Sequence, residues 1–226
     1  MPPIPIPIAV LASGRGSNLQ ALLDALAAPD APGRVVLVVT NRADAGALAK
    51  ARSAAVATHV TAADGQDAED LLGALRGADA RIVVLAGWLK RVPDAVIAAY
   101  RGRLLNVHPA LLPAFGGPGM YGHRVHEAVL ASGARLTGVT VHLVDEQIDH
   151  GAILAQWPVP VRAGDTADTL AQRVLATEHR LLPAAVRIAC RAVAAGREPA
   201  ALFVAADVFV LSDVQETSFD AALVTA

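Results

Sequence analysis

The chain has 226 residues, a length that allows one domain, or one domain with an appendage, and excludes several large domains. Hydrophobic residues make up 54% of the chain and charged residues 18%, a balance that excludes intrinsic disorder and predicts a sizeable core. The net charge is -2 and the 19 basic residues are scattered, so nucleic acid is not expected as a partner.

The single cysteine, Cys190, excludes an intramolecular disulfide and the CxxC spacing of zinc-thiolate sites. It lies in an apolar helical stretch, which favours a core position or an inert surface position over nucleophilic catalysis. Residues 1–7 show no basic signal region, and no apolar run reaches the roughly 18 residues of a membrane span. These features predict a soluble cytoplasmic protein without a membrane partner.

The first two thirds of the chain alternate between strand and helix patterns. The apolar run at residues 6–12 ends in a glycine loop, and leucines at helical spacing follow up to residue 26. Further strands are predicted at residues 35–40, 57–60, 81–85 and 103–107, the 81–85 strand being fully buried, with helices at 45–54, 66–75 and after Pro93. This alternation predicts a parallel sheet covered on both faces.

The pattern changes after residue 130. Residues 138–145 and 153–161 are two β-rich runs separated only by a loop, which predicts an antiparallel pair at one edge of the sheet. A long helix is predicted from Thr166 to about residue 195, kinked or divided at Pro183. Residues 198–226 form an appended segment with an apolar piece, 201–211, and a polar end, 212–220.

The glycine loop at residues 14–18 lies between the end of a predicted strand and the start of a predicted helix. Ser17 or Asn18 is predicted to cap that helix, whose first N–H groups attract an anion such as a phosphate. The dinucleotide fingerprint fails because Leu19 stands where the third glycine belongs, and no Lys-Ser or Lys-Thr completes a Walker loop. By itself, Gly14-x-Gly16 fits a simple tight turn equally well.

Asn106 and His108 lie two residues apart in a strand, so their side chains point to the same face. Pro109 cannot continue a central strand, which places the pair at the C-terminal end of the strand, where open α/β sheets bind ligands. A histidine there can exchange protons, and an asparagine amide can donate to a developing oxyanion. A structural histidine is the alternative interpretation.

Asp149 follows an apolar strand and shortly precedes Gly151, a position that suits a carboxylate aimed into a cleft or one that solvates a turn. His123, His126 and Glu127 form a conceivable metal site, but no HExxH pattern or carboxylate triad supports it. No metal is therefore expected.

Six fragments in collinear order, spanning about residues 6–195, resemble the phosphoribosylglycinamide formyltransferase family. They are residues 13–18 (SGRGSN), 39–45 (VTNRADA), 85–88 (LAGW), 104–113 (LLNVHPALLP), 138–151 (GVTVHLVDEQIDHG), and 163–166 (AGDT) with 178–179 (EH). The resemblance implies an α/β fold, a three-layer αβα Rossmann-like sandwich with a mostly parallel, mixed sheet. The domain covers residues 1–197, and the resemblance gives residues 198–226 no counterpart.

The resemblance also implies a role for each candidate site residue. The ribonucleotide phosphate binds at Gly14, Arg15, Gly16, Ser17 and Asn18, and Glu178 lies near the ribose. The folate pterin is received by Trp88, Leu89, Lys90, Arg91 and Val92. The implied catalytic residues are Asn106, His108 and Asp149.

The implied reaction is transfer of a formyl group from 10-formyltetrahydrofolate, a co-substrate, to the amine of glycinamide ribonucleotide in purine biosynthesis. Asn106 and protonated His108 would stabilise the oxyanion, and Asp149 would hold and charge His108. No metal is required. The expected partners are these two small molecules, without nucleic acid, and a homodimer is left open.

One departure from the family pattern lies in the loop after the LLP motif. A Pro-Gly-x-His run is common there, whereas residues 115–121 form a longer loop without that histidine, in which Tyr121 is a candidate replacement. The alternative functions are another formyl-folate enzyme, either methionyl-tRNA formyltransferase or formyltetrahydrofolate hydrolase, and a non-catalytic nucleotide-binding protein. The extra domains of those two enzymes have no room in this length.

Overall fold

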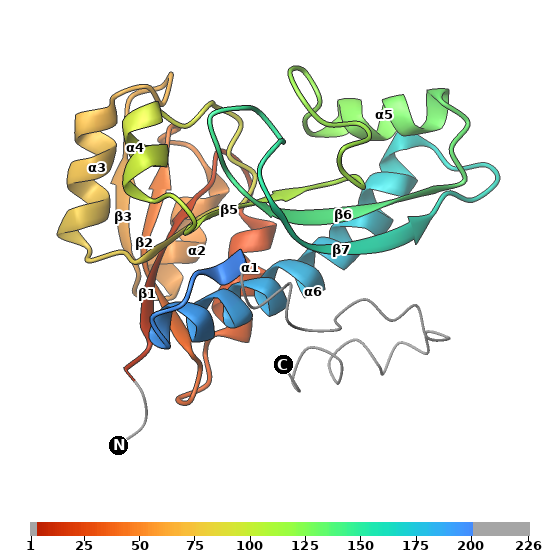
Figure 1. Ribbon diagram of the computed structural model, residues 1–226. Coiled ribbons are helices and arrows are strands. Elements are labelled where there is room, and N and C mark those ends of the chain that lie inside the picture. Colours follow the sequence, from red (N-terminus) through yellow and green to blue (C-terminus); the bar gives the residue numbers. More distant parts are fainter. Residues whose placement is uncertain (1–3, 201–226) are drawn as a thin grey trace.

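The strands form one mixed sheet in the computed structural model, which describes residues 4–200 (Figure 1). The strands are β1 (Ile6–Leu11), β2 (Gly33–Thr40), β3 (Ala57–Val60), β4 (Ile82–Leu85), β5 (Leu104–His108), β6 (Leu136–Leu143) and β7 (Ile153–Pro160). Their order in the sheet is β3-β2-β1-β4-β5-β6-β7. Neighbours from β3 to β5 pair in parallel, and β6 pairs antiparallel with both β5 and β7.

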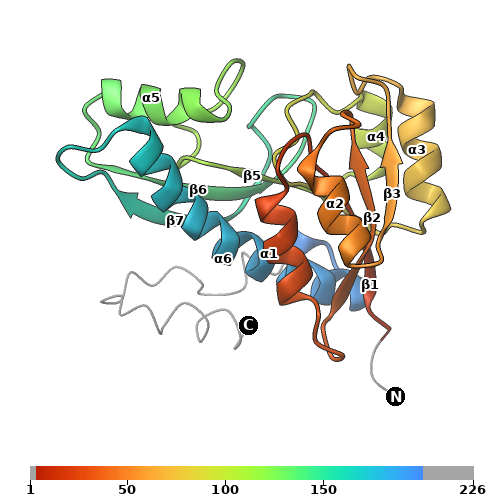
Figure 2. The ribbon, with the colours of Figure 1, turned by 180° about the vertical axis from the view of Figure 1, so that it is seen from behind.

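The helices lie on both faces of this sheet. They are α1 (Ser17–Ala25), α2 (Gly46–Ser53), α3 (Ala68–Gly77), α4 (Asp94–Ala99), α5 (His123–Ala131) and α6 (Ala167–Ala194). Helices α3 and α4 cover the face turned to the viewer in Figure 1, and α1, α2 and α6 cover the face seen in Figure 2. The three-layer α/β sandwich and the antiparallel pair at one edge are thus confirmed.

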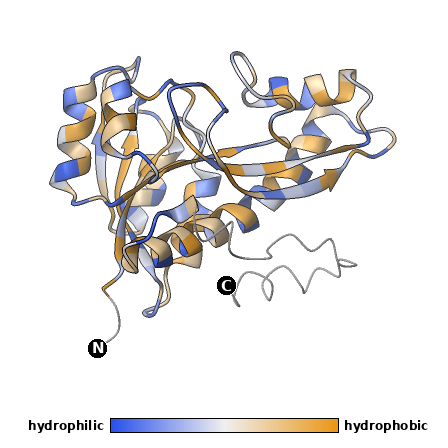
Figure 3. Cartoon of the chain, in the orientation of Figure 1, coloured by the Kyte–Doolittle hydropathy of each residue, from blue (hydrophilic) through white to orange (hydrophobic). Residues whose placement is uncertain are grey.

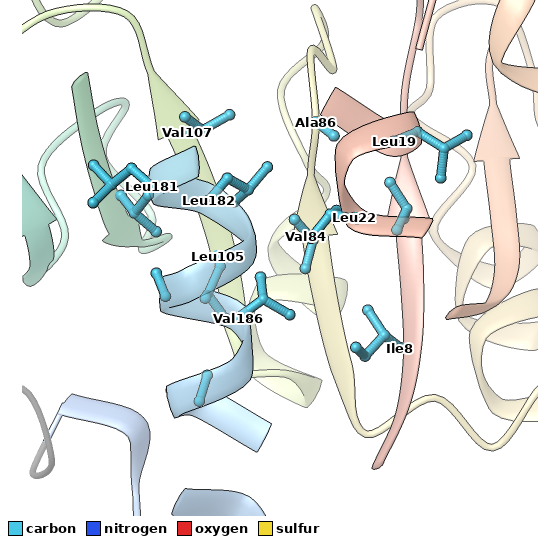
Figure 4. Close-up of a cluster of buried hydrophobic side chains, with 14 of the residues drawn as sticks. Ile8, Leu19, Leu22, Val84, Ala86, Leu105, Val107, Leu181, Leu182 and Val186 are labelled. Carbon is cyan, nitrogen blue, oxygen red and sulfur yellow. The ribbon is translucent and has the colours of Figure 1, made fainter. Parts of the chain in front are cut away.

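Alternating side chains of the strands fill two separate cores. Ile8 and Val10 of β1 belong to the cluster shared with α1, α2 and α6, whereas Ala9 and Leu11 belong to the cluster shared with α3 and α4. In the first cluster Leu181, Leu182 and Val186 of α6 lie beside Leu105 and Val107 of β5 (Figure 4). Burial on both faces explains why the central strands β1 and β4 are continuously apolar, whereas the loop between β6 and β7 is mostly hydrophilic (Figure 3).

The predicted N-cap of α1 is wrong. Gly16, with φ 73°, caps the helix, Ser17 is its first residue, and Asn18 lies inside it. A Cβ on Gly16 would lie 2.8 Å from Cα of Ala47, so the chain needs glycine here for its close approach to α2 as well as for its positive φ. Because Gly16 caps α1, the Asn18 side chain is not used as a cap and bonds to Glu178 of α6 instead.

Two other features differ from the sequence-based expectation. Helix α6 is continuous from Ala167 to Ala194, so Pro183 does not divide it, whereas a kink at Pro183 stays a prediction. Pro183 is buried, and apolar residues of α6 on both sides of it belong to the core cluster shared with the sheet. Helix α5 was not anticipated, because its short sequence mixes histidines and charges with few apolar positions. Cys190 is buried in the core, one of the two positions expected for it, and burial raises the pKa of its thiol to about 12.

The proposed boundary near residue 197 follows closely on the end of α6. The apolar piece 201–211 and the polar end 212–220 lie outside the described residues. Within residues 4–200 no helix is both long and apolar enough to span a lipid bilayer.

Asp165 fixes the start of α6. Its carboxylate accepts hydrogen bonds from both terminal nitrogens of Arg173, each at 2.7 Å, and from the Arg162 amide, also at 2.7 Å. Arg173 also donates to the carbonyl of Pro160 at 2.9 Å, which ties the helix to the end of β7. The hydrogen bond from Arg173 holds the pKa of Asp165 well below its usual value.

Because the pKa of Asp165 is lowered by folding, its contribution to stability is present above the unfolded value and disappears as the pH falls. Asp165→Asn should therefore lower the urea midpoint at neutral pH, and the difference from wild type should shrink below about pH 4. Asp30→Asn, at an exposed position, is the matched control. A wild-type midpoint for Asp165→Asn at neutral pH would contradict this assignment.

Candidate active site

A cavity of about 450 Å3 lies at the C-terminal ends of β4 and β5. In this kind of sheet, ligands bind outside the carboxyl ends of the strands, where the strand order reverses. The cavity is lined by residues 85, 87–92, 97, 106–109, 117–122, 142 and 144–149, together with Asn18 and Glu178. The cavity therefore unites the three expected catalytic residues, the expected folate segment and two of the expected substrate-binding residues.

The glycine loop is joined to the expected folate segment. Ser13 donates its amide to the Gly87 carbonyl at 3.0 Å, and the Leu89 amide donates to the Ser13 hydroxyl at 3.1 Å. These bonds link the loop after β1 to the loop after β4, the two neighbours at which the strand order reverses.

The remaining phosphate-loop candidates lie beside the cavity and do not line it. Gly14 and Arg15 are exposed, Ser17 is half-buried at the first position of α1, and Gly16 is buried against α2. The first N–H groups of a helix lack partners within the helix, so this end of α1 offers donors to an anion.

Asn106 is held by a residue that was not among the expected catalytic ones, His142. The two are directly opposite each other on β5 and β6, and Asn106 Nδ2 lies 3.0 Å from His142 Nε2. His142 Nδ1 lies 2.8 Å from the Leu143 carbonyl, which can only accept, so Nε2 is left as the acceptor for the amide. Burial lowers the pKa of His142, which favours this neutral form.

His108, at the end of β5, lies close to Asp149, in the loop between β6 and β7. His108 Nδ1 lies 3.5 Å from Asp149 Oδ2, and His108 Nε2 donates to the Phe115 carbonyl at 2.8 Å. The second carboxylate oxygen, Oδ1, lies 3.7 Å from His142 Nε2, and the Gly117 amide donates to Oδ2 at 3.0 Å. The carboxylate is therefore placed between two imidazoles, with its side chain only 10% exposed.

The backbone around Asp149 is tightly constrained. Asp149 has φ 55°, a left-handed conformation that is costly for a residue other than glycine. Two glycines make the approach of the loops possible, since a Cβ on Gly116 would lie 3.2 Å from Asp149 Cβ and one on Gly151 would lie 1.9 Å from the Leu143 carbonyl oxygen. Strain of this kind is often found where function requires a fixed side chain.

Glu178 on α6 presents a buried carboxyl to the cavity. Asn18 Nδ2 donates to Glu178 Oε2 at 2.6 Å, and Asn18 Oδ1 is buried without a hydrogen-bond partner among the described residues. Burial raises the pKa of Glu178 to about 7, against the opposing effect of the Asn18 hydrogen bond. Asn18 and Glu178 thus form a polar pair at the junction of α1, α6 and the cavity.

The expected folate segment forms an apolar wall with a charged rim. Trp88 and Val92 are buried, whereas Leu89 is 55% exposed. The charged residues Lys90 and Arg91 are also exposed. Arg91 donates to Asp94 on α4, and its Nη2 lies 3.4 Å from the Glu146 carbonyl across the cavity mouth. This wall suits a flat, partly apolar ligand with a polar end.

The loop after the LLP motif also reaches the cavity. Tyr121 lines it and is 47% exposed, and the Arg124 guanidinium lies 5.2 Å from the centre of its ring. Within residues 4–200, no hydrogen bond or ion pair joins Tyr121 to His108 or Asp149, so its expected role as a replacement for a histidine stays a prediction.

The two histidines that were considered as metal ligands, His123 and His126, have different surroundings. His123 Nε2 lies 2.7 Å from Asp168 Oδ1, and this contact raises the pKa of His123. His126 is buried, and burial lowers its pKa to about 4. Among residues 4–200 there is no group of three or more side chains of the types His, Cys, Asp or Glu that could hold a metal ion.

Comparison with known proteins gives consistent results. The model of the family described as "Formyl transferase" matches residues 6–186. The chain is 44% identical over 189 residues to the chloroplastic phosphoribosylglycinamide formyltransferase of Arabidopsis thaliana, with 81% of this chain and 65% of that protein covered. It therefore spans less than two thirds of that relative.

A bacterial relative is covered more fully. The phosphoribosylglycinamide formyltransferase of Mycobacterium tuberculosis (strain ATCC 25618 / H37Rv) is 46% identical over 189 residues, covering 82% of this chain and 85% of that protein. Among solved structures, the phosphoribosylglycinamide formyltransferase of Anaplasma phagocytophilum matches with a TM-score of 0.78 at 34% identity, covering 82% of this chain and 87% of that one.

The buried carboxyl of Glu178 should make stability depend on pH. Because the unfolded chain releases this proton near the usual glutamate value while the folded chain keeps it until about pH 7, stability should fall between these two values. Glu178→Gln should remove this decline, measured as the urea midpoint at about pH 5 and about pH 7.5. Glu69→Gln, at an exposed position, should keep it. Parallel pH curves for wild type and Glu178→Gln would exclude a protonated Glu178.

Proposed function

The chain belongs to the formyl transferase family, and we propose that it transfers the formyl group of 10-formyltetrahydrofolate to the amine of glycinamide ribonucleotide. The products are N-formylglycinamide ribonucleotide and tetrahydrofolate, and the reaction belongs to de novo purine biosynthesis. The observation that carries this proposal is the cluster of Asn106, His108 and Asp149 on the wall of one cavity, in a chain similar to glycinamide ribonucleotide enzymes over most of its length.

The two substrates would occupy opposite sides of the cluster. The start of α1, residues 14–18, offers N–H donors to the phosphate, and Asn18 and Glu178 offer polar atoms to the ribose. The apolar wall at residues 88–92 would receive the folate, a co-substrate that is consumed once per turnover. Residues 198–226 would take no part, because every proposed site residue precedes them.

Asn106 is suited to bind the oxyanion that forms when the amine attacks the formyl carbon. Its NH2 group has two hydrogens, and the neutral His142 accepts one of them. The second is left for the formyl oxygen, while the bond to His142 fixes the direction of the amide. His142 therefore acts as a positioning residue for Asn106.

His108 and Asp149 would supply charge and proton transfer. Both partners of the ring, the Phe115 carbonyl and the Asp149 carboxylate, accept hydrogen bonds, so the imidazole can carry a proton on each nitrogen. The positive ring would stabilise the oxyanion, and Asp149 would assist the passage of the amine proton to the folate nitrogen, directly or through water. The C–N bond to folate breaks as that nitrogen is protonated.

The proposed reaction is tested by the absorbance change on conversion of 10-formyltetrahydrofolate by the purified chain, with and without glycinamide ribonucleotide. Turnover that requires the acceptor, with formylated ribonucleotide identified by mass spectrometry, is the expected result. Loss of formyl without the acceptor would favour a formyltetrahydrofolate hydrolase. No consumption of either compound would contradict the proposal.

Asp149→Asn keeps the size of the side chain and removes its charge. Turnover should fall by at least about 10²-fold with a much smaller change in KM for either substrate, because the charge acts on the reacting groups more than on binding. Steady-state kinetics with Asp30→Asn as the control measures this. Wild-type turnover in Asp149→Asn would remove the carboxylate from the mechanism.

A further inference from the structure

Gln156 lies on β7, outside the cavity, yet its side chain reaches the loop that follows His108. Its Nε2 lies 2.8 Å from the Leu112 carbonyl oxygen and 3.0 Å from the Thr140 hydroxyl oxygen. In the sheet, His108 pairs with Thr140 and Thr140 pairs with Gln156. The three side chains therefore form one row across β5, β6 and β7, on the same face.

The Thr140 hydroxyl is at the centre of this network and is fully buried. It donates to the Ala110 carbonyl at 2.7 Å and accepts from the Leu112 amide at 3.0 Å and from Gln156 Nε2. A hydroxyl has one hydrogen to donate and two lone pairs to accept with, so its capacity is fully used. The backbone of residues 110–112 is thereby tied to both β6 and β7.

These ties lead directly to the contacts of the catalytic pair. Phe115, whose carbonyl accepts from His108, lies only three residues beyond Leu112 and has φ 57°. Gly117, whose amide donates to Asp149, comes two residues later. Between them Gly116 is packed so closely that a Cβ there would lie 2.5 Å from Cδ2 of Leu112. The position of Leu112 thus sets the position of both contacts.

We propose that Gln156 and Thr140 are positioning residues, which fix the His108–Asp149 pair by anchoring the loop from Ala110 to Gly117. The expected effect on turnover rests on the proposed function. The expected effect on the hydrogen bond between His108 and the Phe115 carbonyl does not. Neither Gln156 nor Thr140 lines the cavity, so neither contacts a ligand bound there.

Loss of the anchor should affect turnover and leave binding almost unchanged. A small displacement of reacting groups costs rate far more than affinity, because the reaction requires a fixed geometry. Gln156→Leu removes the donor and keeps the approximate size of the side chain. Its kcat should fall by about tenfold, with KM for both substrates within about twofold of wild type.

A second measurement follows His108 directly. In the chain labelled with 15N-histidine, exchange of the His108 Nε2 proton with water should be at least about tenfold faster in Gln156→Leu, because the Phe115 carbonyl no longer stays in place. Thr140→Val should show both effects more strongly, and Thr140→Ser, which keeps the hydroxyl, should remain close to wild type in both. If Thr140→Val does not fold, comparison of kcat and His108 proton exchange between Gln156→Leu and wild type still tests the proposal.

Val159→Ala is the matched control, since Val159 is a buried residue of β7 that faces Thr137 and has no part in the network. It should lower the urea midpoint and leave kcat and the His108 proton exchange unchanged. Equal losses of kcat in Val159→Ala and Gln156→Leu, or unchanged His108 exchange in Gln156→Leu, would overturn the inference. A wild-type chain without formyl transfer would contradict the proposed function alone, because the exchange measurement requires no reaction.

Discussion

The antiparallel pairing of β5 with β6 is the constraint on which the site depends. Its register places His142 opposite Asn106 and Thr140 opposite His108, so that each proposed catalytic side chain of β5 has a polar neighbour on the next strand. A register shift by one residue would turn these neighbours to the other face of the sheet and put apolar side chains in their place. The reversal of strand direction between β5 and β6 thus supplies polar partners that β4, the parallel neighbour on the other side of β5, does not.

The same reversal explains why a strongly apolar sheet can carry a polar site. Parallel strands β1 and β4 carry only apolar side chains, which pack into the cores on both faces, so polar side chains lie beyond their ends. At the end of β5 the polar groups satisfy one another: a neutral His142 accepts from Asn106, and Asp149 accepts from the Gly117 amide. Buried polar groups are tolerated when they are paired in this way.

The loops complete the site at a cost in backbone strain. Phe115 and Asp149 both adopt positive φ, and Gly116 and Gly151 permit contacts that a side chain would block. Strain of this kind persists only where the surroundings hold it, and here the surroundings are the core contacts of β6 and β7 and the hydrogen bonds from the sheet to the loop. Fold stability and site geometry are therefore coupled through the edge of the sheet that lies farthest from β3.

The sequence by itself determined the alternation of strands and helices, the antiparallel edge, and the placement of Asn106 and His108 at a strand end, because local periodicity and Pro109 act within a few residues. It did not determine that Gly16 caps α1, that α6 continues through Pro183, or that His142, Thr140 and Gln156 join the site. These outcomes depend on contacts between residues far apart in the chain, such as Asn18 with Glu178. Only the packed tertiary structure specifies which distant side chains meet, since many pairings are compatible with the same local pattern.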